Sequence, residues 1–373
     1  MTAARPLPPP PEGAPRASAL LKSVPTAASL ARAGRPGLRL RRPRLTRRGL
    51  QVALGVIWLL DGALQFQPVM LGKGFGQQII SPAGDGQPTF VGAAVHWAAR
   101  LIAAHPVAWD VPFALIQVLL GLGLLYPRTA RAALAASLPW VLGVWYFGEG
   151  LGGIASGNAS LLTGAPGAVL LYGVLALAAW PRDDGRPDVQ PARWPALAWL
   201  RGGRSDVRPA AWLALTWAAL WALGAILQGL PVNDSGAATG SAISGGAGAV
   251  PGWLATFDTS VGAWFTHHGG VVYVLIAVEA LIGLAALFPK TLRFSAAAGI
   301  VLAAATWLVP ENFGQIPGGQ ATDPNSAPLI ALMGIALIAS GGLSIRWPLR
   351  PGRRALPDDH QAGREDPGAQ PRP

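Results

Sequence analysis

Eight stretches of the chain are almost continuously apolar, and each is between 16 and 20 residues long. They are residues 50–66, 107–126, 130–147, 165–180, 212–230, 271–288, 294–309 and 327–345. A hydrocarbon core of about 30 Å is crossed by about 20 helical residues. Backbone polar groups in lipid must be satisfied within the segment, which favours helices. The pattern predicts an all-α polytopic membrane protein with about eight transmembrane helices.

Two further stretches, 89–105 and 251–267, are apolar on one helical face only. Phe90, Trp97 and Leu101 share that face in the first stretch, and His96 and Arg100 lie off it. A helix with this periodicity suits the membrane–water interface. We therefore expect an interfacial amphipathic helix between the first two membrane helices of each half.

Basic residues are distributed asymmetrically about the apolar runs. If the runs cross the bilayer alternately, all of the 29 Lys and Arg except Lys73 and Arg100 fall on one side. Cytoplasmic segments of membrane proteins are enriched in Lys and Arg. The chain is therefore expected to be a multi-pass plasma-membrane protein with both termini in the cytoplasm.

Composition agrees with this class. Only 13% of the residues are charged, against about 25% in a soluble domain. The net charge of +11 follows the asymmetry above, so it indicates an anionic lipid bilayer as partner and no nucleic acid. The absence of cysteine excludes a disulfide, a thiolate nucleophile and a cysteine-bound metal within the chain.

The chain divides into five predicted regions. Residues 1–48 are rich in Pro, Ala and Arg and are expected to form a disordered basic cytoplasmic arm. Residues 49–180 and 212–346 are predicted to be two four-helix membrane units. Residues 181–211 form a cytoplasmic linker, and 347–373 a disordered cytoplasmic tail.

The two membrane units match each other. Shifting the chain by 162 residues places 117–166 on 279–328 without a gap, with identities at Trp, Glu, Pro and Gly positions such as Trp145 on Trp307. Nearer the start of the unit a shift of 163 places Gln65 on Gln228. Matches of this kind indicate a duplication. Four crossings return the chain to its starting side, so the two copies are predicted to be parallel repeats.

The unit resembles a known family. A four-helix unit with an outer amphipathic stretch, a second helix containing Gly121 and Gly123, and the turn Pro127-Arg128-Thr129 is similar to the DoxX/DoxD-like membrane proteins. The segments 58–65 and 148–153 resemble an uncharacterised bacterial subgroup. This resemblance implies a membrane subunit of a redox system, with a quinone as cofactor and a redox protein as partner. It supplies no catalytic residue for this chain.

Polar residues inside the apolar runs are candidates for an intramembrane site. They are Asp61, Gln65, Gln117, Gln228 and Glu279. A charge at the bilayer centre is costly, so such groups face the bundle and often mark a pathway. Gln117 and Glu279 are repeat equivalents, which also fits helix–helix hydrogen bonding without further function. If the units face each other, Asp61 and Glu279 would share one cavity.

A second candidate site lies on the outer side. Its residues are His96, Arg100, His105, Glu149, His267, His268 and Glu311. Glu149 and Glu311 end the third helix of each unit, where the helix dipole disfavours negative charge. They either pair with a base such as Arg100 or serve a site. No ligand pair has tight metal spacing, so no metal is predicted.

Three functions remain open from the sequence. The first is the redox subunit, and the second is a small-molecule or proton-coupled carrier that uses Asp61 and Glu279. The third is a non-catalytic scaffold. The chain carries no nucleophile–base pair and no recognisable cofactor motif, so we do not expect an autonomous enzyme.

Overall fold

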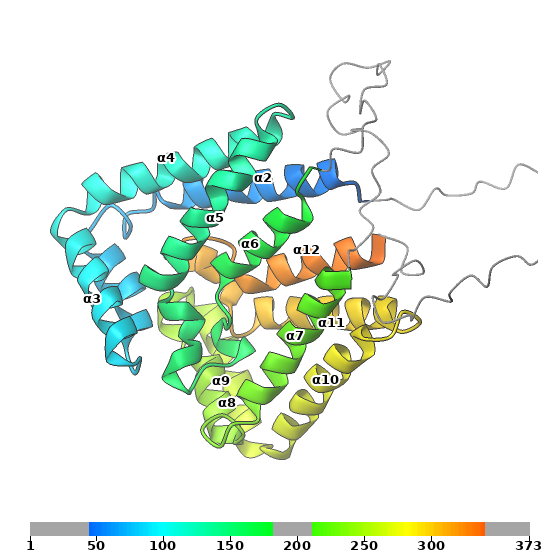
Figure 1. Ribbon diagram of the computed structural model, residues 1–373. Helices are drawn as coiled ribbons and strands as arrows, with labels where there is room; N and C mark the ends of the chain where they lie inside the picture. The colour runs from blue at the N-terminus through cyan, green and yellow to red at the C-terminus, as the bar shows by residue number, and fades with distance from the viewer. Residues whose placement is uncertain (1–44, 182–210, 340–373) are drawn as a thin grey trace, which may run out of the picture. The chain divides into compact units, whose positions relative to one another are not determined.

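The computed structural model describes residues 45–181 and 211–339, and this part of the chain is helical and contains no β-strand (Figure 1). The all-α prediction is thus confirmed for these residues. The predicted linker and tail, and the arm up to residue 44, lie outside the described residues. The arm had been placed at 1–48, but Arg47 and Arg48 already belong to the first helix.

Each apolar run forms a helix. The first half comprises α2 (Arg47–Leu64), η2 (Phe75–Ile80), η3 (Ser81–Gly84), α3 (Thr89–Ala104), α4 (Pro106–Leu125), α5 (Ala130–Phe147), η4 (Gly150–Ser156), η5 (Leu161–Thr163) and α6 (Ala168–Ala178). The second comprises α7 (Ala211–Gln228), α8 (Gly236–Ser244), η7 (Ala247–Ala249), α9 (Gly252–His267), α10 (Gly270–Ala286), α11 (Leu292–Leu308), η8 (Asn312–Gly318) and α12 (Ser326–Ala339).

The helix of the fourth run begins later than predicted. Residues 165–180 were expected to form one helix, but α6 has only 11 residues. Gly164 and Gly167 have φ angles of 92° and 103°, and a right-handed helix cannot include them. The helix therefore begins at Ala168.

Small residues bring two pairs of helices together. α2 packs on α4 and α7 packs on α10, as Figure 1 also shows. A β-carbon added at Gly121 would lie 2.8 Å from the carbonyl oxygen of Gly55, and one at Gly283 would lie 3.0 Å from that of Ala218. Close backbone approach at small residues is the usual packing mode of membrane helices.

The two halves meet through α6 and α12. Two side-chain hydrogen bonds cross between the halves in opposite senses. Asn233 Nδ2 of the second half donates to the carbonyl oxygen of Ala159 at 2.9 Å, and Gln67 Nε2 of the first donates to that of Ala321 at 2.7 Å. Ala159 and Ala321 are related by the 162-residue shift, so each half makes the same kind of contact with the other.

One end of the first half is closed by side chains of α2. Arg48 Nη1 donates to the carbonyl oxygen of Leu124 at 2.7 Å, and Gln51 Nε2 donates to that of Ala179 at 2.9 Å. These carbonyls end α4 and α6, where helices leave acceptors unpaired. Arg48, predicted to belong to the disordered arm, is thus buried and caps the C-terminus of α4, where a cation is favourable.

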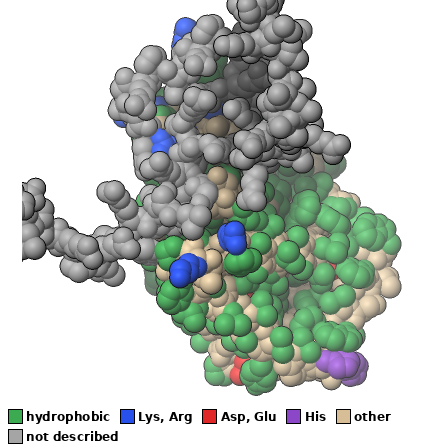
Figure 2. Space-filling view, turned by 90° about the vertical axis from the view of Figure 1, so that its right-hand side faces the viewer, with side chains coloured by type: hydrophobic (Ala, Val, Ile, Leu, Met, Phe, Trp, Pro, Cys, Tyr) green, Lys and Arg blue, Asp and Glu red, His purple; other side chains and the backbone are tan. Residues whose placement is uncertain are grey.

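Much of the surface is apolar. Tyr273 on α10 and Val301 on α11 are 61% and 70% exposed. Figure 2 shows hydrophobic side chains over most of the described surface on one face. Contiguous apolar surface of this extent is rare on soluble monomers, and it is typical of lipid-facing helices.

Three described helices are long and apolar enough to cross a membrane: Pro106–Leu125, Ala211–Gln228 and Leu292–Gly318. Gly252–His267 and Gly270–Ala286, bent by 101°, make a fourth if they count as one span. By length and composition the described residues therefore provide three or four spans. The helices α6 and α12 are shorter apolar helices.

Candidate functional site

A cavity of 1120 Å³ opens at the end of the first half where α2 and α5 end and α4 and α6 begin. Its wall is completed by the segment from Phe75 to Gln87 and by the loop Gly314–Asn325 of the second half. Ligand pockets for small molecules usually enclose about 300–1,000 Å³. The cavity is therefore large enough for a whole organic molecule.

Aromatic side chains form much of the cavity wall. They include Trp58, Phe75, Trp109, Phe113, Trp140 and Tyr172. The rings are packed on each other: the centroids of Trp58 and Tyr172 are 4.6 Å apart, and those of Phe113 and Trp140 are 5.4 Å apart. Such mutual contacts hold the wall in place without a ligand.

Three residues of the predicted intramembrane site line this cavity: Asp61, Gln65 and Gln117. Asp61 is 2% exposed, and its Oδ2 accepts a hydrogen bond of 2.7 Å from the hydroxyl of Tyr172. Its other oxygen, Oδ1, and the Oε1 atoms of both glutamines are buried without a partner. Buried polar atoms are normally hydrogen-bonded, so these three acceptors are available to a ligand.

Asp323 completes the acidic part of the cavity, and the sequence analysis missed it. It belongs to the loop before α12, and it lies close enough to Asp61 and Glu149 to repel both electrostatically. Burial raises the pKa of Asp323, against the opposing effect of hydrogen bonds from Thr322 and the Asn325 backbone N–H. Nothing in the loop sequence signals that an acid of the second half enters the first. Tyr172 was also missed, although a lone hydroxyl in an apolar run was a usable signal.

Glu149 lines the cavity from the loop after α5 and caps the next helix. Its Oε1 accepts from the backbone N–H of Val169 at 3.0 Å, and it also interacts with that of Ala168. The expectation that Glu149 occupies an unfavourable helix end is therefore wrong. The carboxyl follows the C-terminus of α5 but sits at the N-terminus of α6, where a negative charge is stabilised. No ion pair joins Glu149 to Arg100, which is exposed within the described part.

Glu311 makes the corresponding contacts in the second half. It accepts from the backbone N–H of Ala327, at 3.1 Å to Oε2, and from the hydroxyl of Ser326. The indole of Trp145 donates to the carbonyl oxygen of Pro166 at 2.8 Å, and that of Trp307 donates to Pro324 at 2.9 Å. In these bonds Pro166 corresponds to Pro324, whereas the ungapped alignment paired it with Pro328. The stretch from Glu311 to Ala327 is four residues shorter than the stretch from Glu149 to Val169.

Glu279 and Gln228 lie outside the cavity lining, so the prediction that Asp61 and Glu279 share one cavity is wrong. Glu279 is 2% exposed and faces Gly224 of α7: a β-carbon added at Gly224 would lie 3.4 Å from its Oε2. Gln228 Nε2 donates to the carbonyl oxygen of Asn233 at 2.7 Å. This bond connects α7 to the loop that follows it, so Gln228 has a structural role.

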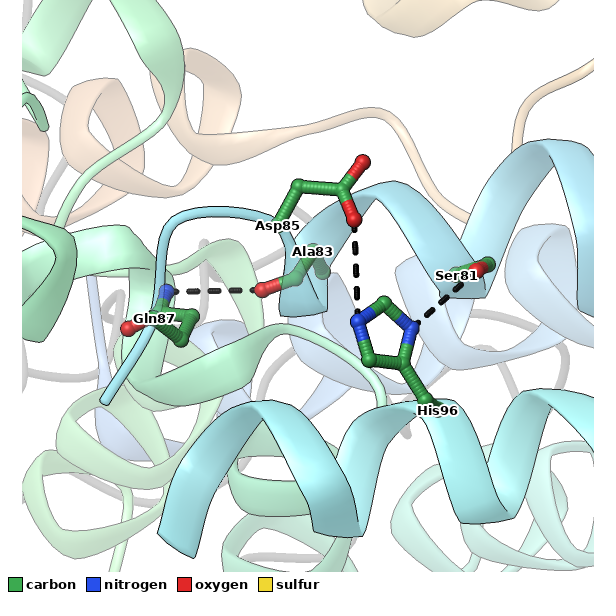
Figure 3. Close-up of polar contacts among 5 residues, drawn as sticks. All are labelled: Ser81, Ala83, Asp85, Gln87 and His96. Atoms are coloured by element: carbon green, nitrogen blue, oxygen red, sulfur yellow. Dashed lines mark hydrogen bonds and ion pairs between the residues drawn. The ribbon is translucent and has the colours of Figure 1, made fainter. Parts of the chain in front are cut away.

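The predicted outer-face residues do not come together. His96 of α3 lies between two residues of the preceding segment, 81–87. Its Nδ1 is 3.2 Å from Ser81 Oγ, and its Nε2 is 3.6 Å from Asp85 Oδ1 (Figure 3). Gln87, beside them in Figure 3, donates from Nε2 to the carbonyl oxygens of Ala83 and Gly150. These contacts hold the segment against α3 and the loop after α5.

The other histidines of that site are exposed and separate. His105 lies between α3 and α4, and His267 ends α9. His268 stacks on Trp264 with centroids 4.8 Å apart, and its Nδ1 is 2.8 Å from that residue's carbonyl oxygen. Within residues 45–181 and 211–339, no group of three or more His, Cys, Asp or Glu is placed to hold a metal ion.

Two further buried acids were not singled out from the sequence. Asp110 on α4 and Asp258 on α9 are fully buried; the oxygens of Asp110 lack hydrogen-bond partners, and Asp258 interacts with the side chain of Asn312. Neither lines the cavity.

Comparison with models of known protein families, with curated proteins and with solved structures found no match to this chain.

Glu149 makes stability depend on pH. Burial, with a smaller contribution from Asp323, raises the pKa of Glu149 to about 8, above its usual 4.5. Between these two values the folded protein keeps a proton that the unfolded chain releases. Stability therefore falls as pH rises from about 4.5 to about 8 and is level beyond that. Glu149→Gln keeps the hydrogen-bonding shape and is expected to flatten the profile.

The measurement is the melting temperature of purified protein between pH 5 and pH 9. The difference between the two profiles reports Glu149 together with its interaction with Asp323. Equal slopes in the wild type and in Glu149→Gln would contradict the prediction. Arg100→Gln, at an exposed position, serves as the control and is expected to follow the wild-type profile.

Proposed function

We propose that this protein is a multi-pass membrane protein that binds a small lipophilic molecule in the outer half of the bilayer. The observation that carries the proposal is the cavity: it combines packed aromatic walls with buried, unpartnered polar atoms. Pockets built in this way are the usual form of small-molecule sites. A scaffold has no need of such a cavity, so we place the scaffold function last.

The proposal includes eight crossings in two parallel four-helix repeats, with both termini in the cytoplasm. Contacts at equivalent positions support it. Thr129 Oγ1 donates to the carbonyl oxygen of Gly123 at 2.8 Å, and Thr291 Oγ1 donates to that of Ala285 at 2.6 Å. Left-handed backbone follows α5 at Leu151 and α11 at Phe313. The reciprocal bonds to Ala159 and Ala321 are the contacts expected from a two-fold relation between the copies.

The orientation can be tested by single-cysteine labelling, because the chain contains no cysteine. We expect Ser156→Cys and Thr322→Cys to react with an impermeant maleimide on intact cells. Arg128→Cys and Lys290→Cys should react only after permeabilisation. Labelling of positions 128 and 156 from the same side would contradict the eight-span arrangement.

Within this function, the redox subunit is the candidate that the DoxX-like resemblance favours. The bound molecule would then be a quinone, and the partner a membrane redox protein. Gln65 and Gln117 carry amide donors suited to quinone carbonyl oxygens, and the aromatic wall suits a quinone ring.

A proton-coupled carrier is the second candidate, and a specific observation favours it. Asp61, Glu149 and Asp323 gather at one cavity, and clustered buried acids are typical of proton relays in transporters. The lining comes from the outer end of the bundle, so the carrier would be open to the outside in this structure.

The proposed function is tested by extraction in mild detergent followed by mass spectrometry of bound lipids and quinones. We expect a stoichiometric small molecule with the wild type. Trp140→Ala and Phe113→Ala, which remove wall rings, should lose it. Recovery of no small molecule, together with no binding of added quinone or aromatic compounds, would exclude the proposal.

A further inference from the structure

The lining of the cavity is acidic. Asp61, Glu149 and Asp323 line it, and among the described residues no Lys, Arg or His does so. A fourth lining acid, Asp85, is largely exposed and lies 3.6 Å from His96. This contrasts with a chain whose net charge is +11. Acids that face one low-dielectric space are neutralised either by binding protons or by binding a cation, and above the raised pKa values only the cation remains.

The unpartnered atoms also favour a positive ligand. Asp61 Oδ1, Gln65 Oε1 and Gln117 Oε1 are buried acceptors without donors, in side chains that are 2%, 2% and 8% exposed. The indole N–H of Trp58 is a buried donor without a partner at the same cavity. A ligand that pairs with these three acceptor atoms must supply positive charge or hydrogen-bond donors.

The walls are suited to an organic cation rather than a metal ion. Rings of Trp58, Trp109, Trp140 and Tyr172 line the space, and aromatic faces attract ammonium groups, with tryptophan the strongest. A volume of 1120 Å³ is far larger than a bare ion fills. The acids thus supply charge, and the rings supply shape and dispersion.

The equivalent place in the second half has been closed. Leu161 packs directly on Gly224, which corresponds to Asp61, and Gly224 faces Glu279, which corresponds to Gln117. Asp323, from the loop before α12 of the second half, enters the cavity of the first half. The place beside Gly224 in the second half is therefore filled by Leu161. The place beside Asp61 in the first half is open and carries the carboxyl groups of Asp61 and Asp323.

We infer that the cavity binds a lipophilic organic cation, with Asp61 and Asp323 as its counter-ions and the tryptophan rings as its wall. This inference rests on the proposed function and names its ligand class. It selects a cation over a neutral quinone.

The test uses two probes of the same shape and opposite charge, tetraphenylphosphonium and tetraphenylborate, with a short-chain benzoquinone as the neutral probe. Binding is measured by equilibrium dialysis on the full chain in lipid nanodiscs at about pH 8.5. We expect tetraphenylphosphonium to bind more tightly than tetraphenylborate. Asp61→Asn and Asp323→Asn should each weaken it about tenfold or more. Asp258→Asn, a buried acid outside the cavity, should change it less than twofold.

The two variants that weaken cation binding must retain or improve tetraphenylborate binding, which shows that the cavity is still formed. Equal or tighter binding of tetraphenylborate by the wild type would overturn the cation inference. Binding of the quinone without tetraphenylphosphonium would overturn it while leaving the proposed function standing. Binding of none of the three probes would overturn both.

Discussion

Gly152→Ala is expected to destabilise the protein strongly, whereas Gly153→Ala is expected to be tolerated better. Both glycines have left-handed backbone, with φ angles of 62° and 75°. Alanine in that conformation costs about 1–2 kcal/mol at either position. A β-carbon at Gly152 would also overlap the carbonyl oxygen of Pro166, while one at Gly153 would lie 3.5 Å from the Ala159 β-carbon, an ordinary contact.

The overlap matters because Pro166 also connects α5 to the start of α6. Its carbonyl oxygen accepts the bond from Trp145, and the N-terminus of α6 that follows holds Glu149. Overpacking adds about 1–3 kcal/mol to the backbone cost, so Gly152→Ala should lose about 2–5 kcal/mol in total. Size-exclusion profiles and melting temperatures in detergent measure the effect. Equal melting temperatures for the two variants would show that the loop relaxes freely.

Tyr172→Phe is expected to destabilise the protein by about 1–3 kcal/mol, because it leaves the buried carboxyl of Asp61 without its donor. Removing both polar partners is expected to cost less than removing one. The double variant Asp61→Leu with Tyr172→Phe should therefore be more stable than Tyr172→Phe alone.

A double-mutant cycle measures this coupling directly. Melting temperatures of the wild type, both single variants and the double variant are compared in ligand-free detergent. If the effects of the two substitutions simply add, the hydrogen bond between Tyr172 and Asp61 does not contribute to stability, and other contacts hold these side chains in place. Tyr273→Phe, at an exposed position on α10, is the matched control and should be neutral.

Helix positions were readable from the sequence because lipid-facing and core-facing residues are both apolar, so each helix appears as a continuous run. The run 130–147 coincides with α5, and 89–105 and 251–267 match α3 and α9 within one residue. Boundaries were wrong where backbone conformation decided them, as at Gly167, where a φ of 103° starts α6 late.

The candidate site was only half predictable. Asp61, Gln65 and Gln117 were found because a polar side chain in an apolar run is costly and therefore conspicuous. Asp323 was not found, because an acid in a loop is ordinary until the chain folds. Pairing Asp61 with Glu279 failed because it assumed that the two units face each other across one cavity, and the sequence does not show which helix faces meet.

The sequence by itself determined the helices and their apolar character, since these depend on local composition and spacing. Tertiary structure alone decided that the loop before α12 of one half completes the cavity of the other, and that Leu161 fills the equivalent place. Packing between distant segments sets both outcomes. Whether a side chain fills a space or leaves it open depends on neighbours that are far away in the sequence, and no local pattern identifies those neighbours.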